Sequence, residues 1–190
     1  TPDELARAQS FPVPTDPPFP NERFRMVANV DALILDGGPH GLGYIRGSVA
    51  VDPSAWFFQA HFFQDPVWPG SLGLESFLQL LKVLAGERWG LGLRAEGLGP
   101  EKPASDLASS PALSSQPLAL SRVFAALALH RPHEWIYRGQ VIPRDKTVTV
   151  DVVVTAVDDA SRTVTAGGFL TVDGRVIYQM VDFTVQINDE

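Results

Sequence analysis

The chain has 190 residues, 45% of them hydrophobic, a formal net charge of −7 and no cysteine. This length and apolar content predict one medium-sized domain with a substantial core. The acidic net charge argues against a nucleic-acid-binding surface. The lack of cysteine excludes disulfides and cysteine-ligated zinc and is compatible with a reducing cytoplasm. No apolar run approaches the roughly 18 residues of a membrane span, and no signal peptide is evident.

Residues 1–24 are predicted to form a proline-rich linker or an arm that packs on the domain surface. Half of the residues in FPVPTDPPFP (11–20) are proline, which favours a stiff, extended backbone. The first residue is Thr rather than Met, which suggests a piece of a longer polypeptide. We assign residues 25–190 to a single domain with an insert at about 86–133.

Two strands and an aromatic run follow. Apolar residues predict strands at Met26–Leu35 and Gly43–Val51, joined by the turn-rich sequence DGGPHG. The aromatic run that begins at Trp56 also looks strand-like, and it carries His61.

A Pro-Gly break at residues 69–70 precedes an apolar helix, predicted over Ser71–Ala85. The helix is apolar on almost every side, which is typical of a helix buried in a core. Its polar residues fall on one narrow stripe: Glu75, Gln79 and Lys82.

The insert at about 86–133 fits no compact fold. Residues 97–120 are rich in proline, serine and alanine and are expected to form a mobile loop. Residues 118–130 are predicted to form a short helix.

The C-terminal third is predicted to be an antiparallel meander. Valines alternate with polar residues over 148–154, and Asp173-Gly174 is a strong hairpin signal. The expected strands are Trp135–Ile142, Thr147–Val157, Thr163–Val172 and Arg175–Ile187. Strands, one buried helix and a meander predict an α+β fold in which an antiparallel sheet wraps around one long central helix.

His61 and Glu75 suggest acid–base chemistry within fifteen residues of sequence. A buried imidazole stays neutral and can accept a proton near pH 7, and a carboxyl buried in an apolar helix can stay protonated and donate one. The N–H groups of a helix that starts near Gly70 can stabilise an enolate oxygen. Together these groups can remove a proton next to a carbonyl and expel a hydroxyl. The alternatives are a core histidine and a plain turn before a helix.

Other chemistries have weaker support in the sequence. Asp65 and His61 form a metal pair without a third ligand at suitable spacing, and a proline separates His130 from His133. No serine lies in a G-x-S-x-G elbow, and no phosphate-binding glycine loop is present.

The run WFFQAHFFQDPVWPGSLGLE (56–75) resembles the hot-dog-fold β-hydroxyacyl-acyl-carrier-protein dehydratases. It is most similar to the β-hydroxydecanoyl dehydratase/isomerase branch, whose pattern is WFF…HF…DPVMPG…LGLD. The resemblance continues in WIYRGQVIP (135–143) and DGRVIYQMVDFTV (173–185), and it covers roughly 43–85 and 134–187. WIYRGQVIP, the insert and the proline-rich segment look most like dehydratase domains of polyunsaturated fatty acid synthases and related polyketide synthases.

The resemblance implies a role for several residues. His61 matches the catalytic histidine, and Val67 matches the residue whose backbone carbonyl orients the imidazole. Gly70 matches the glycine whose N–H holds the thioester oxygen. Glu75 falls where the dehydratase/isomerase has Asp and where simpler dehydratases have Glu.

Two further positions belong to the same expected site. Gln79 matches a polar helix position, and Trp68 replaces the usual Met, which could reshape the acyl tunnel. Because Glu75 is one methylene longer than Asp, the match does not by itself imply isomerase activity.

The resemblance implies dehydration of (3R)-hydroxyacyl thioesters, held on the phosphopantetheine of acyl carrier protein, to 2-trans-enoyl thioesters, with no cofactor and no metal. In this family the histidine and the acid of one site come from two hot-dog units, so we expect a second unit, either in a homodimer or as a tandem domain. The alternatives are a dehydratase that also isomerises its product to the cis-3-enoyl form and a non-catalytic unit of a tandem pair.

Overall fold

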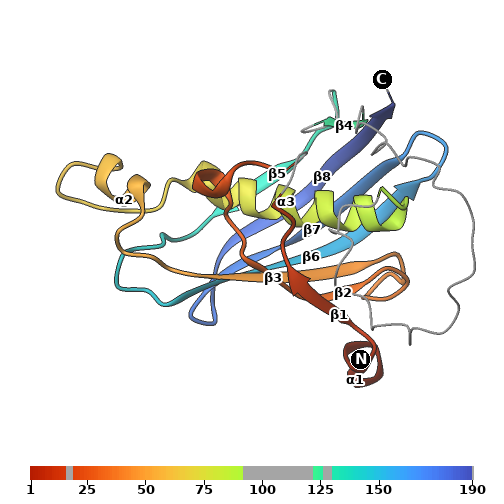
Figure 1. Ribbon diagram of the computed structural model, residues 1–190, viewed down its shortest axis with the longest axis horizontal. Coiled ribbons are helices and arrows are strands. Elements are labelled where there is room, and N and C mark those ends of the chain that lie inside the picture. The colour runs from red at the N-terminus through yellow and green to blue at the C-terminus, as the bar shows by residue number, and fades with distance from the viewer. Residues whose placement is uncertain (16–18, 92–121, 126–129, 190) are drawn as a thin grey trace, which may run out of the picture.

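An eight-stranded sheet and one long helix form the core of the computed structural model, which describes residues 1–15, 19–91, 122–125 and 130–189. Figure 1 shows the helix α3 running along one face of the curved sheet. In chain order the elements are α1 (Pro2–Ala6), β1 (Gln9–Pro12), η1 (Glu22–Phe24), β2 (Asn29–Ile34), β3 (Tyr44–Ala50), α2 (Trp56–Ala60), α3 (Gly70–Arg88), β4 (Arg122–Ala125), β5 (Glu134–Tyr137), β6 (Thr147–Asp158), β7 (Thr163–Val172) and β8 (Arg175–Asp189).

Every strand pair in the sheet is antiparallel. The strand order is β1-β2-β3-β6-β7-β8-β4, and β5 also pairs with β8. The β7–β8 hairpin turns at Asp173 and Gly174, which have positive φ angles of 49° and 82°, as the Asp-Gly signal predicts. The predicted α+β architecture is therefore confirmed.

The core lies between α3 and the sheet. The helix buries residues on most of its circumference, among them Phe77, Leu80 and Leu84, and it contacts β3, β6, β7 and β8. The alternating valines of β6 point into this core, as their spacing predicts: Val148, Val150, Val152 and Val154 are buried. Burial of side chains of this size contributes roughly 1.5–3 kcal/mol each, which holds α3 in place.

The aromatic run before His61 is a short helix, α2, so the prediction of a strand-like run is wrong. Phe57 and Phe58 are both buried, whereas Gln59 and Ala60 are exposed. In a strand, neighbouring side chains point to opposite faces, and only one of two adjacent phenylalanines would reach the core. A helical turn buries both, and His61 follows as its C-terminal cap residue.

Near the insert, one prediction is wrong and one predicted strand is shorter than expected. Residues 122–125 form strand β4 rather than part of a helix, because they pair with the end of the long strand β8, and such tertiary pairing overrides helix propensity. The predicted strand over Trp135–Ile142 ends at Tyr137, although Arg138 N still donates to Ile177 O at 2.8 Å. The expected mobile loop, 97–120, lies outside the described residues.

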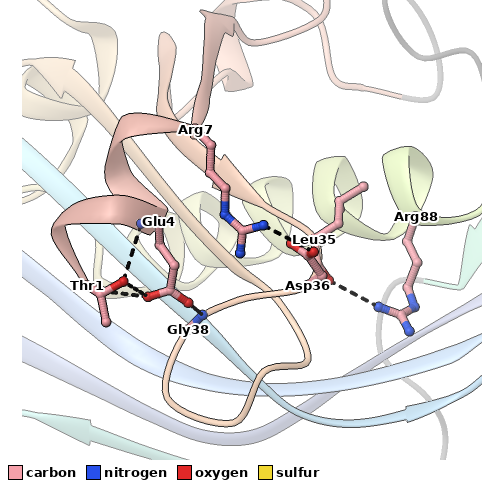
Figure 2. Close-up of polar contacts among 7 residues, drawn as sticks. All are labelled: Thr1, Glu4, Arg7, Leu35, Asp36, Gly38 and Arg88. Atoms are coloured by element: carbon pink, nitrogen blue, oxygen red, sulfur yellow. Dashed lines mark hydrogen bonds and ion pairs between the residues drawn. The ribbon is translucent and has the colours of Figure 1, made fainter.

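Part of the proline-rich N-terminal segment packs on the domain. β1 pairs with β2 at the sheet edge, and Val13 and Phe19 are buried. Figure 2 shows α1 beside the turn that follows β2, where Arg7 contacts Asp36 at 3.4 Å. This ion pair is exposed, so it contributes little to stability.

No helix within the described ranges combines the length and the hydropathy needed to cross a membrane.

Candidate active site

His61 opens a short loop that returns to Val67. The backbone N–H of His61 donates to Phe57 O at 2.9 Å, and its carbonyl accepts from Val67 N at 2.8 Å. The imidazole Nδ1 lies 3.1 Å from Val67 O. Because a carbonyl only accepts, this contact assigns the proton of the neutral ring to Nδ1 and leaves the lone pair on Nε2. The ring can therefore take a proton through Nε2.

Two exposed phenylalanines follow the histidine. Phe62 is 56% exposed and Phe63 is 89% exposed, and the ring centroids of His61 and Phe62 are 3.8 Å apart. Backbone hydrogen bonds between Phe62 and Asp65 close the loop. Within the described part of the chain, no group of three or more histidine and acidic residues could hold a metal ion.

The helix α3 begins with uncapped N–H groups. Its N-cap residue is Pro69, and no side chain caps the helix. A Cβ on Gly70 would lie 2.9 Å from Trp135 Cη2 and 3.3 Å from Tyr137 Cε2, so a larger residue at the helix start requires the Trp135 side chain of β5 to shift. Leu72 N donates to Pro69 O at 2.9 Å, so the N–H of Gly70 and the helix dipole are the groups available to an oxygen that carries negative charge.

The carboxylate of Glu75 is held by Gln79, one turn further along α3. Gln79 is fully buried; its Nε2 donates to Glu75 Oε1 at 2.9 Å and to Phe24 O at 2.8 Å, and its Oε1 accepts from Met26 N at 2.9 Å. Gln79 therefore joins the acid, the central helix and the N-terminal segment in one network.

His61 and Glu75 are not joined to each other. No hydrogen bond or ion pair links them among the residues that the structure describes; each is held by its own neighbour, Val67 or Gln79. Both are half-buried, so the complete burial on which the acid–base expectation rested is absent in the single chain. The role of each residue stays a prediction.

An aromatic cluster beside the helix start was not singled out in the sequence. The Trp135 and Tyr178 ring centroids are 5.7 Å apart, and those of Tyr137 and Tyr178 are 5.0 Å apart. A Cβ on Gly73 would lie 2.0 Å from Tyr178 Cε2, so only glycine fits there. Burial, and then the neighbouring Tyr137, raises the pKa of Tyr178, which keeps its hydroxyl protonated. The motif DGRVIYQ contains Tyr178, but its position against Gly73 depends on the fold.

Trp68 is 3% exposed and stacks on Phe57, with ring centroids 5.3 Å apart. Its backbone N–H donates to Val141 O at 2.9 Å. The side chain lines a cavity that also touches Phe58 and Met26, and neither His61 nor Glu75 lines this cavity. Whether Trp68 shapes an acyl tunnel stays a prediction.

Comparison with known proteins assigns the chain to a family. Residues 19–99 and 116–181 match the FabA-like domain. A polyunsaturated fatty acid synthase component from Thraustochytrium sp. is 33% identical over 159 residues, which are 82% of this chain but 9% of that protein. The dehydratase heterocomplex ApeI:P from Xenorhabdus doucetiae has a similar fold, with a TM-score of 0.52 and 11% identity over 89% of this chain and 87% of that chain. The chain therefore belongs to the FabA-like family and has the hot-dog fold of the β-hydroxyacyl-acyl-carrier-protein dehydratases.

Proposed function

We propose that this domain dehydrates (3R)-hydroxyacyl thioesters on acyl carrier protein to 2-trans-enoyl thioesters. The observation that carries the proposal is the contact between His61 Nδ1 and Val67 O at 3.1 Å. It leaves Nε2 as the basic nitrogen of a neutral imidazole. Family membership supports the reaction class.

The reaction needs three groups. His61 Nε2 takes the α-proton, and the electrons of the C–H bond move into the thioester carbonyl. The N–H of Gly70 stabilises the resulting enolate oxygen, helped by the dipole of α3. Glu75 protonates the departing hydroxyl, which leaves as water when the α,β double bond forms. Proton return from His61 and to Glu75 restores the starting state. No step requires a cofactor.

We infer that the acid acting with His61 belongs to a second hot-dog unit. Four exposed aromatic side chains on the His61 loop and on β5 support this inference: Phe62, Phe63, Trp135 and Tyr137. Contiguous exposed apolar groups mark interaction surfaces, and the rings of Trp135 and Tyr137 are in edge contact, with centroids 5.7 Å apart. The partner is a second copy of this chain or a neighbouring domain. Light scattering tests the first case, because a strictly monomeric chain with full activity contradicts a shared site.

The similarity to a polyunsaturated fatty acid synthase component supports a place in such a synthase or in a related polyketide synthase. The chain spans 9% of that relative, so the similarity covers one small part of that much longer protein. The substrate would then arrive on a carrier protein of the same assembly.

The test is incubation with (3R)-hydroxyacyl-acyl carrier protein and mass analysis of the acyl group. We expect the (3R) thioester to lose one water and the (3S) thioester to remain intact. An intact (3R) thioester, at protein concentrations where two units associate, contradicts the proposal and favours a non-catalytic unit. A cis-3-enoyl product would instead identify a dehydratase that also isomerises.

A further inference from the structure

The short helix η1 contacts both α2 and α3. On the α2 side, Trp56 Nε1 donates to Arg23 O at 3.0 Å, and the rings of Trp56 and Phe24 meet edge to face with centroids 5.6 Å apart. On the α3 side, Gln79 Nε2 donates to Phe24 O at 2.8 Å. None of the residues of η1 is buried, so these contacts, rather than burial of its own side chains, hold η1 against the domain.

The segment that follows η1 also fixes the orientation of the Gln79 amide. Met26 N donates to Gln79 Oε1 at 2.9 Å. Because the Phe24 carbonyl only accepts and the Met26 N–H only donates, the two contacts decide which end of the amide is the nitrogen. Gln79 Nε2 uses its other hydrogen on Glu75 Oε1, at 2.9 Å. A shift of η1 therefore moves the donor that holds the Glu75 carboxyl.

We propose that Trp56 is a positioning residue for the dehydration. It fixes η1, and η1 fixes the Glu75 carboxyl through Gln79. The inference rests on the proposed function, since it assigns a further residue to the same reaction. Trp56 acts through these intervening residues rather than on the substrate. Misplacement of a catalytic group by about 1 Å can lower a rate by about 10²-fold, so a small movement of η1 is enough to matter.

The first test compares two indoles that make hydrogen bonds of the same length. Trp56→Phe removes the N–H but keeps an aromatic ring, and water can replace it at Arg23 O because Arg23 is exposed. Trp89→Phe is the matched control: Trp89 Nε1 donates to Asp159 at 3.0 Å, beyond the other end of α3. With a short 3-hydroxyacyl thioester, Trp56→Phe should lower kcat by about fivefold or more and change KM by less than about twofold, because the lost contact affects the transition state rather than substrate binding. Trp89→Phe should change neither constant.

The second test needs no substrate. It follows, by NMR, the exchange with solvent of the side-chain amide hydrogens of Gln79, which is fully buried. Exchange should be about fivefold faster in Trp56→Phe than in Trp89→Phe, as expected when one hydrogen bond that holds the neighbouring segment is lost. The backbone amides of β6, which report opening of the whole domain, should differ by less than about twofold between the two variants.

A double substitution tests the route through Gln79. In a chain that already carries Gln79→Leu, Trp56→Phe should lower kcat by less than about twofold further, because the link to Glu75 is already lost. Independent losses, equal kcat in Trp56→Phe and Trp89→Phe, or equal exchange of the Gln79 amide in those two variants would each overturn the inference. The two single variants decide the matter even if Gln79→Leu does not fold. An unsubstituted chain that leaves the thioester intact would contradict the proposed function instead, and the exchange measurement would still decide whether Trp56 holds Gln79.

Discussion

The two ends of helix α3 differ in their polar contacts: a side chain at the C-terminal end binds neighbouring segments, whereas the N-terminal end has no side-chain cap. At its C-terminal end, Arg88 donates to the carbonyls of Leu35 and Leu42 at 3.4 and 3.2 Å. Its Nε lies 3.6 Å from Asp159, an ion-pair distance too long for a hydrogen bond, and Asp159 also accepts from Trp89 Nε1 at 3.0 Å. Figure 2 shows Arg88 reaching the turn after β2.

At its N-terminal end the same helix has no side-chain cap, starts at a glycine and presents a half-buried carboxylate. N–H groups at a helix start that lack a side-chain cap can bind water or a ligand oxygen. We therefore expect the Arg88 end to contribute to stability and the Gly70 end to the chemistry, and substitutions at each end can test this expectation.

The largest effect is expected at the chemical end. His61→Ala should lower the rate of dehydration by about 10²–10⁴-fold, the usual loss when an acid–base group is removed. Glu75→Gln should lower it similarly, because the amide cannot protonate the hydroxyl. The measurement is turnover of 3-hydroxyacyl thioester beside a thermal melt. Near-natural turnover in either folded variant would remove that residue from the mechanism.

Alanine substitutions of Gly70 and Gly73, in the first turns of α3, should affect activity and stability to different degrees. Gly73→Ala places a Cβ 2.0 Å from a buried Tyr178 ring carbon, so we expect a loss of about 1–3 kcal/mol in the free energy of unfolding. Gly70→Ala meets the partly exposed Trp135 at 2.9 Å, and that side chain can move. Denaturant titration should therefore show a smaller loss for Gly70→Ala, while its turnover falls at least as much as that of Gly73→Ala.

Gln79→Leu and Arg88→Leu form a matched pair on one helix. The first leaves the buried Met26 N–H and the Phe24 carbonyl without a partner, which costs about 1–3 kcal/mol for each buried group, and it also releases Glu75. We expect Gln79→Leu to lower both stability and turnover per folded molecule. Arg88→Leu should lower stability alone. Reduced turnover in a folded Arg88→Leu variant would contradict the expectation that the Arg88 end of α3 affects stability alone.

The smallest effect is expected on carrier-protein docking. Both the domain and acyl carrier proteins are acidic, so docking should depend on local basic residues, for which Arg138 and Arg144 are exposed candidates. Charge reversal at both should raise KM for acyl-carrier-protein substrate several-fold and leave turnover of a short pantetheine thioester unchanged. Equal losses on both substrates would mean that the reversal damages the site or the fold.

Much of the scaffold could be predicted from periodicity. The buried helix, the alternation in β6 and the Asp173-Gly174 hairpin each follow from spacing within one segment. The helix α2 was missed because three aromatic residues in a row fit a strand or a helical turn equally well without the core beside them. β4 was missed because its pairing with β8 joins segments more than 60 residues apart.

The candidate site likewise combines residues of a local motif, which the sequence predicts, with contacts between distant segments, which it does not. His61, Gly70 and Glu75 lie in one continuous motif, and the His61–Val67 contact spans six residues. The two backbone partners of Gln79 lie 53 and 55 residues away, and no local sequence pattern predicts them.

The hydrogen bonds of Gln79 limit how far the N-terminus of this domain can be shortened. The matched family region begins at residue 19, and a boundary drawn from the catalytic motif alone would fall later still. A piece that begins after Met26 would lack both backbone partners of a buried amide and would loosen the carboxylate that the amide holds. Such a piece would keep every residue of the motif and still be a poor enzyme, so its inactivity would say nothing about His61.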